Sequence, residues 1–239
     1  MIMNIRKNII VILVFILGNV VFGAIATRGF TGIVDFPNAY TLRANNYNIG
    51  GTIDNINNES VVGFMLETGF LTQLEAGIKI TTDNTKINDS LLKSNIKFQF
   101  LTESTLPALA VGYVESDSKS IYYGKNIVNL SYGYANMTKS INNFFDEKFE
   151  KISLTCGVSY DENKNVNGFS GLEVPIYNNV KLLLEFYSYH KIELGKEKRD
   201  FSLNVGTEFF TTEKLITKVF WRDINETFGI IISYIGIYR

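Results

Sequence analysis

The chain has 239 residues, of which 46% are hydrophobic and 20% are charged, and its formal net charge is −1. The aromatic content excludes a disordered chain, the single Cys excludes a disulfide scaffold or a cysteine-based zinc site, and the balanced charge gives no footprint for nucleic acid. The mean hydropathy of +0.06 is high for a soluble protein and low for a helical membrane protein. The order of the apolar residues along the chain therefore has to separate these classes.

The first segment has the residue order of a secretory signal peptide. Arg6-Lys7 precede an apolar run, Ile9–Phe22, and Ala24-Ile25-Ala26 follows as an A-x-A cleavage site. As a helix this run would span about 21 Å, which is short of the roughly 30 Å of bilayer hydrocarbon. We predict cleavage after Ala26, with cleavage after Gly23 as the second option. Residues 1–26 are then a signal peptide, and residues 27–239 are a single exported domain.

After Thr27 the apolar residues recur with a period of two, which is typical of a β-strand with one apolar and one polar face. Four stretches follow this period clearly: Lys93–Phe100, Ile127–Tyr134, Glu150–Tyr160 and Asp200–Phe209. In the second stretch, Tyr132 and Tyr134 fall on the predicted apolar face. In the third, the apolar face carries Ile152, Leu154, Cys156, Val158 and Tyr160.

The full pattern predicts an all-β chain of about twelve strands, with roughly 10 to 14 as the range. The links between them are rich in Asn, Asp and Gly, as turns require, and only Asn142–Lys151 has a helical pattern. The strands are predicted near Tyr47–Asp54, Ser60–Glu67, Gln73–Thr81, Lys93–Leu101, Ala108–Glu115, Ser120–Tyr134, Phe149–Tyr160, Asn167–Val174, Val180–Tyr189, Arg199–Phe210, Lys214–Arg222 and Glu226–Tyr238.

Two architectures fit these strands: a soluble β-sandwich and a transmembrane antiparallel β-barrel. Strands of about ten residues, tilted by about 40°, match the roughly 25 Å apolar band of outer-membrane barrels. Charge in mid-strand suits a wet lumen better than a sandwich core, and it occurs at Glu75, Lys79, Lys97, Glu185 and Lys218. Aromatic residues gather near strand ends, where interfacial girdles belong: Tyr47, Tyr113, Tyr134, Tyr160, Tyr187, Tyr189, Trp221, Tyr234 and Tyr238. These features favour the barrel.

The predicted links also alternate in length, as short periplasmic turns and longer outer loops do in outer-membrane barrels. The second, fourth, eighth and tenth links are short, and the third, fifth, seventh and ninth are longer, the ninth being His190–Lys198. The sixth, Ala135–Lys148, is long on the short side. It predicts either a periplasmic insertion or a different strand count.

Three sequence stretches resemble YjbH-like outer-membrane proteins. Gly29–Ala39, which reads GFTGIVDFPNA, is followed by NIGG at 48–51 and is similar to the opening of that family. LEAGI at 74–78 and LPALAVG at 106–112 are similar to its early strand and hairpin. The resemblance implies an outer-membrane β-barrel linked to exopolysaccharide production or export, and it implies no catalytic residue.

Catalytic and metal-binding candidates are few. His190 and Ser188 share a strand face, so a lipid-modifying barrel enzyme is one hypothesis, whereas a polar pair at a strand end explains them without catalysis. Cys156 is interpreted as a small hydrophobic residue. Acidic residues in the predicted outer loops lack the spacing of a calcium site, and they are Asp161, Glu162, Glu193 and Glu197. We therefore predict no cofactor, no metal and no catalytic residue.

The polar strand faces contain the best candidates for a functional role, as side chains that line the lumen. They are Glu75, Lys79, Lys97, Gln99, Lys151, Glu185, Asp200, Asn204, Glu208, Lys218 and Arg222. The leading hypothesis is a non-enzymatic outer-membrane barrel that serves surface polysaccharide export or envelope integrity, and a narrow porin-like pore for small solutes is the alternative. The expected partners are outer-membrane lipid, the barrel-assembly machinery, and polysaccharide or other envelope proteins.

Overall fold

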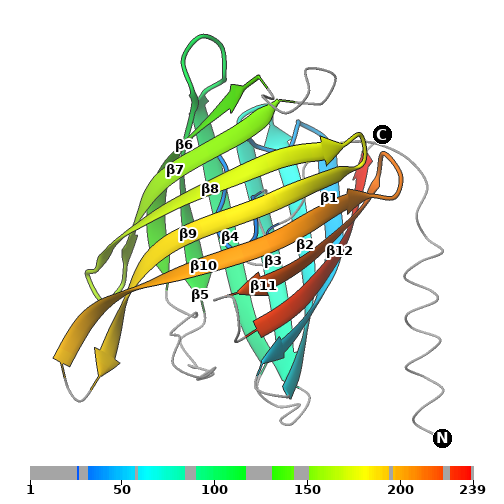
Figure 1. Ribbon diagram of the computed structural model, residues 1–239. Helices are drawn as coiled ribbons and strands as arrows, with labels where there is room; N and C mark the ends of the chain where they lie inside the picture. The colour runs from blue at the N-terminus through cyan, green and yellow to red at the C-terminus, as the bar shows by residue number, and fades with distance from the viewer. Residues whose placement is uncertain are drawn as a thin grey trace, which may run out of the picture.

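A computed structural model describes residues 26, 32–56, 59–83, 90–116, 131–142, 151–193, 196–222 and 227–237. These residues form twelve strands (Figure 1), and their bounds are β1 Asn46–Ile56, β2 Glu59–Leu71, β3 Leu74–Asp83, β4 Ser90–Leu101, β5 Ala108–Ser116, β6 Tyr132–Ile141, β7 Ile152–Asp161, β8 Val166–Tyr177, β9 Val180–Glu193, β10 Lys196–Phe210, β11 Leu215–Arg222 and β12 Thr227–Ile237. Within the described ranges, no helix combines the length and the hydropathy that a membrane span needs.

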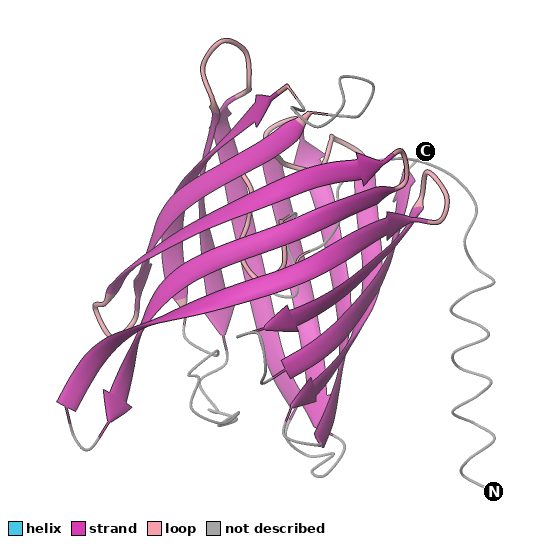
Figure 2. Ribbon diagram, in the orientation of Figure 1, coloured by secondary structure: helices cyan, strands magenta, loops and turns pink. Residues whose placement is uncertain are grey.

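The twelve strands close into one antiparallel barrel (Figure 2). Each strand pairs with its neighbours in sequence, and β1 closes the ring by pairing with β12 from Asn46↔Ile237 to Ile56↔Thr227. Because closure pairs both edges of every strand, the sheet presents no free edge. The predicted fold class is confirmed, and eleven of the predicted strands agree with observed strands to within a few residues.

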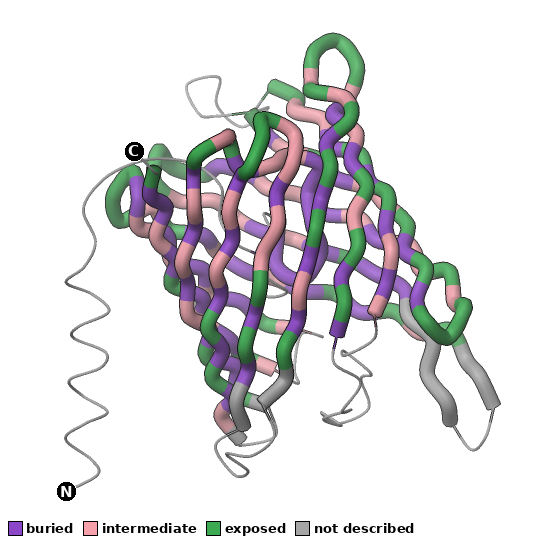
Figure 3. Tube along the Cα trace, turned by 180° about the vertical axis from the view of Figure 1, so that it is seen from behind, coloured by how far each residue is buried: buried purple, intermediate pink, exposed green. Residues whose placement is uncertain are grey.

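The outer surface of the barrel is apolar and the inner surface is polar. Along β10, the side chains of Phe201 and Leu203 are exposed, whereas those of Ser202 and Asn204 are buried. Figure 3 shows buried positions alternating with more exposed ones along the strands. In β4, Ile96, Phe98 and Phe100 are likewise exposed, and in β7 so are Leu154, Val158 and Tyr160. The predicted alternation is confirmed in these three strands, with Ile152, fully buried at the start of β7, as the exception.

The sixth strand differs from its prediction in both position and facing. It spans Tyr132–Ile141 rather than Ser120–Tyr134. Tyr132 and Tyr134 are each only 5% exposed and point inward, while Met137 takes an outward position. The prediction that these tyrosines share an apolar, lipid-facing strand face is therefore wrong. Their rings pack against other aromatic rings inside the barrel, which a period of two cannot distinguish from packing against lipid.

The predicted girdle is correspondingly reduced, because Tyr187 on β9 also points inward and is buried. Tyr113, Tyr160 and Trp221 are exposed on the outside, and Tyr47 pairs with Tyr234 across the β1–β12 junction at a ring separation of 6.4 Å. The side chains of Tyr189 and Tyr238 lie outside the described residues.

Two predicted links are strands in the structure. Residues 135–141 of the predicted sixth link belong to β6, and most of the predicted ninth link belongs to the β9–β10 hairpin, which continues to Glu193 and resumes at Lys196. The prediction of a long sixth loop beginning at Ala135 is therefore wrong. Residues 143–150, which carry most of the predicted helical pattern, lie outside the described residues, as do residues 1–25 of the predicted signal peptide.

Candidate functional site: the lumen and its N-terminal segment

The inside of the barrel contains the N-terminal part of the chain, residues 32–45, which we call the luminal segment. Ile33, Val34, Ala39 and Leu42 are at most 1% exposed. The segment bonds to inward-facing side chains on β3, β6, β9, β10 and β11, which lie on different sides of the ring. Only a chain inside the barrel can reach all of them.

The innermost part of the luminal segment is a tight turn. Gly32 and Pro37 form an antiparallel bridge, and the Ile33 N–H donates to the Phe36 carbonyl at 3.1 Å. A Cβ atom at Gly32 would lie 2.3 Å from the Phe36 carbonyl oxygen. The turn therefore requires glycine at this position, because no side chain fits between the two backbone strands.

The carboxylate of Glu185 binds the tip of this turn. Three successive backbone N–H groups, those of Val34, Asp35 and Phe36, donate to its oxygens at 3.3, 3.1 and 2.9 Å. The Asn204 amide donates to the same carboxylate at 2.7 Å. Consecutive N–H groups that converge on one anion form a concave nest, and hydrogen bonds to a charged acceptor are stronger than neutral ones.

Basic side chains on β11 hold the other polar groups of the turn. Lys218 Nζ donates to the carbonyl oxygens of Gly32 and Ile33, at 2.7 Å each, and lies 3.3 Å from Glu208. Arg222 Nε donates to Asp35 Oδ1 at 2.9 Å. We call the group formed by Glu185, Asn204, Lys218 and Arg222, together with Asp35, the polar latch.

Arg222 and Asn204 each serve two acidic partners within this latch. The Arg222 guanidinium also approaches Asp54 on β1 at 3.4 Å, and the Asn204 amide reaches Asp35 Oδ2 at 3.2 Å as well as Glu185. Buried carboxylates are tolerated when cations and hydrogen-bond donors surround them. The latch therefore supplies the turn with both the acceptors and the donors that its backbone needs.

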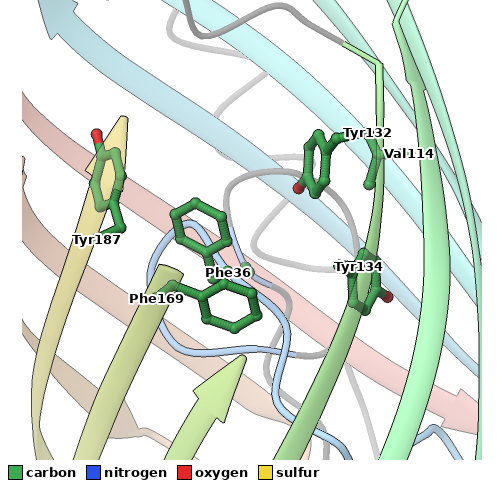
Figure 4. Close-up of a cluster of buried hydrophobic side chains, with 7 residues drawn as sticks. Phe36, Val114, Tyr132, Tyr134, Phe169 and Tyr187 are labelled. Carbon is green, nitrogen blue, oxygen red and sulfur yellow. The ribbon is translucent and has the colours of Figure 1, made fainter. Parts of the chain in front are cut away.

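Aromatic side chains enclose the same turn. The Phe36 ring stacks on Phe169 of β8 at a centroid distance of 4.6 Å and 16° between planes, and it lies 5.1 Å from the ring of Tyr187 (Figure 4). Tyr132 lies 6.4 Å away on its other side. With Ala26, these rings form a buried apolar cluster inside the lumen. Stacked and tilted rings at these distances contribute a favourable free energy in addition to the contribution from the apolar area that they bury.

A second set of contacts holds the part of the segment that leads to β1. Asn136 donates to the Pro37 carbonyl at 2.7 Å, and the Ala39 N–H donates to Thr138 Oγ1 at 2.7 Å. The Leu42 N–H donates to Glu75 at 2.8 Å, and Glu75 is paired with Lys97 at 2.9 Å. The wall therefore satisfies the segment's backbone along most of its length.

Tyr40 contacts the link between β4 and β5. Its hydroxyl donates to the Glu103 carboxylate and lies 2.8 Å from Ser140 Oγ. Burial and the bond to Glu103 raise the pKa of Tyr40. Burial acts to raise the pKa of Glu103, but hydrogen bonds from Tyr40, Ser140 and Lys139 outweigh it, so the pKa of Glu103 is lowered. The carboxylate is thus the form that this contact stabilises.

Most of the predicted lumen-lining residues are buried inside the barrel. Those at most 6% exposed are Glu75, Lys79, Lys97, Gln99, Glu185, Asn204, Glu208 and Lys218. Arg222 points inward and is mostly buried, whereas Asp200 is half-buried and Lys151 is exposed in the link before β7. The structure brings Glu185, Asn204, Lys218 and Arg222 together in the polar latch. Gln99 reaches the segment as well, through Thr41 Oγ1 at 3.1 Å.

Several residues of this site were not predicted from the sequence, chiefly Asp35, Phe36, Phe169 and Glu103. The only local signal was the Gly32–Pro37 spacing, which is typical of a tight turn. Their partners are far away in sequence, as with Arg222, which lies 187 residues from Asp35. No period or motif predicts such contacts.

The other chemical candidates do not converge. Ser188 Oγ accepts a hydrogen bond from the Gly168 N–H at 2.9 Å, and the side chain of His190 lies outside the described residues. Cys156 is a free thiol on β7, and Asp161 accepts hydrogen bonds from Asn165 and Asn167. Among the residues that the structure describes, no three His, Cys, Asp or Glu side chains gather in a way that could hold a metal ion.

No family model and no curated protein matches the chain, but solved structures do. A KdgM porin superposes with a TM-score of 0.60 at 9% identity, covering 80% of this chain and 99% of the porin. A NanC porin superposes with a TM-score of 0.57 at 8% identity, covering 81% of this chain and 100% of the other. A KdgM porin described as in complex with disordered oligogalacturonate gives 0.56 at 7% identity, over 81% and 99%. At these identities the likeness shows the fold, that of an outer-membrane porin barrel.

Proposed function

We propose that the protein is a non-enzymatic outer-membrane barrel that serves the traffic of surface polysaccharide or the integrity of the envelope. The observation that carries this proposal is the closed barrel with an apolar outer surface and a charged inner one. A water-soluble protein would expose to water the large side chains that ring this barrel, among them Phe64, Phe98, Phe186 and Ile232. Lipid covers such a surface without penalty.

The YjbH-like resemblance supports the polysaccharide part of the proposal. The described part of its opening motif, Gly32–Ala39, forms the tight turn and the chain that follows it in the lumen. Residues 29–31 of the motif lie outside the described residues. The described part of the motif therefore lies inside the barrel, which supports a role for its residues in the lumen rather than in strand β1.

A narrow pore for polar solutes is the second candidate, and the interior favours it. Charged side chains of both signs line the wall, for example Lys79, Lys97, Glu185 and Glu208. The similar barrels are porins, and one was solved with an acidic oligosaccharide. If the protein is such a pore, the transported solute is a small polar molecule. Charged and neutral sugars are the first solutes to test.

The absence of catalysis is also part of the proposal. Ser188, the hydroxyl half of the predicted Ser/His pair, is engaged with the backbone of Gly168 on β8. This contact ties the hydroxyl to the sheet, as a structural residue would be tied. Phospholipase activity in the purified protein that disappears in His190→Ala would contradict this part of the proposal.

Cell fractionation combined with gel migration tests the location. We expect the protein in the outer-membrane fraction, with migration in detergent that changes on boiling, because a closed barrel resists detergent until it is heated. A soluble protein whose migration ignores boiling would overturn the proposal. Stepwise conductance in planar bilayers separates the pore from the envelope role.

Mass spectrometry of the exported protein tests the cleavage site. The polypeptide begins at Thr27 if the first predicted site is used and at Ala24 if the second is used. Ala26 is fully buried in the aromatic cluster with Phe36, so cleavage after Gly23 keeps this contact and cleavage after Ala26 removes it. The packing favours the second site.

A further inference from the structure

We infer that the luminal segment closes the barrel of the intact protein and that the polar latch keeps it closed. This inference rests on the proposed passage of solutes through the lumen and deepens it by naming what controls that passage. The segment contacts β3 and β4 through Glu75 and Gln99, β6 through Asn136, and β9 to β11 through the latch. Contacts on opposite sides of the ring place the chain across the lumen rather than along one wall.

The segment also fills the width between these contacts. Ile33 and Val34 pack in a buried cluster with Met65, Leu183, Phe220 and Ile231, side chains that come from β2, β9, β11 and β12. Phe36 fills the opposite side with its ring cluster from β5, β6, β8 and β9. One apolar cluster packs on each side of the Gly32–Pro37 turn. The turn and the side chains packed against it therefore block the lumen.

The latch is the part of this closure that depends on charge. Asp35 is its one charged residue that belongs to the segment rather than to the wall, and it faces Arg222 at 2.9 Å and Asn204 at 3.2 Å. Exchanging Asp35 for Lys would replace its attraction to Arg222 by a repulsion. Every strand pair of the barrel would keep its own partners, because Asp35 belongs to no strand.

The luminal segment covers part of the inner wall, so the accessibility of a wall residue to a labelling reagent reports its position without a conductance measurement. Thr155 on β7 is fully buried, and its hydroxyl lies 2.9 Å from that of Thr138, which in turn accepts the Ala39 N–H. A cysteine at Thr155 in a Cys156→Ser background is therefore covered while the segment is in place. A water-soluble maleimide reports when the segment leaves.

The experiment compares the full chain with Asp35→Lys and with Glu162→Lys, a matched control of the same charge change in an exposed turn. Folding of each variant is checked by heat-modified migration. Loss of charge-assisted hydrogen bonds shifts the docking equilibrium by about ten-fold or more. We expect labelling at position 155 and liposome permeability to sucrose to rise by that order in Asp35→Lys and to stay at the wild-type value in Glu162→Lys.

Two other results are decisive. Equal labelling of position 155 in wild type and in Asp35→Lys, with sucrose passing both, overturns the closure and leaves the pore function standing. Increased labelling without any permeability shows that the latch holds the segment in place, but it overturns the proposed passage of solutes and with it the closure that rests on that passage.

Discussion

Glu103 illustrates how single residues hold the N-terminal part of the chain. It receives hydrogen bonds from Tyr40, from the Ser140 N–H at 2.8 Å and from Ser140 Oγ at 2.9 Å, and it lies 3.3 Å from Lys139. These donors favour the carboxylate, so the pKa of Glu103 is lowered despite its partial burial. A group whose pKa is lower in the folded state contributes stability above its ordinary pKa and loses it as the pH falls through the folded value.

Glu103→Gln tests this contact. At pH 7 the variant should lose about 1–3 kcal/mol of the free energy of unfolding, because the bonds to a charged acceptor become neutral. The difference from wild type should shrink as the pH falls below the ordinary carboxyl pKa of about 4.3. It should vanish only below the lowered pKa of the folded state, where Glu103 is neutral in the folded protein as well. Urea unfolding in detergent micelles at both pH values measures it, with exposed Glu162→Gln as the control. A difference that persists at acid pH contradicts this assignment.

At the scale of the strand, glycines opposite aromatic residues explain how the large ring of Tyr134 on β6 fits inside the barrel. Gly112 on β5 is paired with Tyr134 on β6, and a Cβ at Gly112 would lie 2.3 Å from the tyrosine hydroxyl oxygen. Gly157 on β7 is paired with Phe169 on β8 in the same way. Each ring lies over a bare stretch of backbone inside the barrel. On β6 the positions on either side of Tyr134 are held by the small residues Gly133 and Ala135.

The predicted outward direction of one face of β10 can be tested by mutation. The pattern of buried and exposed side chains already confirms the alternation along this strand. Val205 lies on the same outer face as Phe201 and Leu203. Val205→Arg should cost about 2–4 kcal/mol if the residue lies near the bilayer midplane, since lipid cannot solvate the charge. Val205→Leu, which keeps the face apolar, is the control. Unfolding in lipid vesicles measures both variants, and equal stability of the two would place Val205 away from lipid.

At the scale of the molecule, the barrel and the luminal segment are separable. Pairing of β1 with β12 closes the ring over eleven residue pairs, and none of them involves residues 32–45. The segment adds contacts to the inner wall and to the links between strands, such as that of Tyr40 with Glu103. We therefore expect the barrel to form without it, with water taking over the polar wall groups that the segment now satisfies.

Deletion of residues 27–42 from the exported protein tests this separation. The deletion should keep heat-modified migration in detergent, because every strand pair is retained, and it should unfold at a lower temperature than wild type because the Phe36 cluster is lost. A boiled and an unboiled sample that migrate identically would show that the segment is needed to form the barrel. Gel migration over a temperature series provides both readings.

The sequence by itself determined the architecture: an all-β chain, about twelve strands, an apolar outer face and a charged inner one. These follow from a period of two along each strand, which is a local property and needs no knowledge of partners. Glu185, Asn204, Lys218 and Arg222 were identified as inward-facing for the same reason.

Only the tertiary structure decided what those inward residues contact. A strand pattern separates two faces, but it does not distinguish an aromatic residue that faces lipid from one that packs in the lumen, and Tyr132 and Tyr134 were placed on the lipid-facing side for this reason. Tyr187 lies on the inward face of β9 with Glu185, but its place near a strand end put it in the predicted girdle. Nor does a strand pattern indicate that residues 32–45 lie within the ring. Asp35 meets Arg222, and Val34 meets Glu185, only because closure of the sheet brings residues more than 150 positions apart around one lumen.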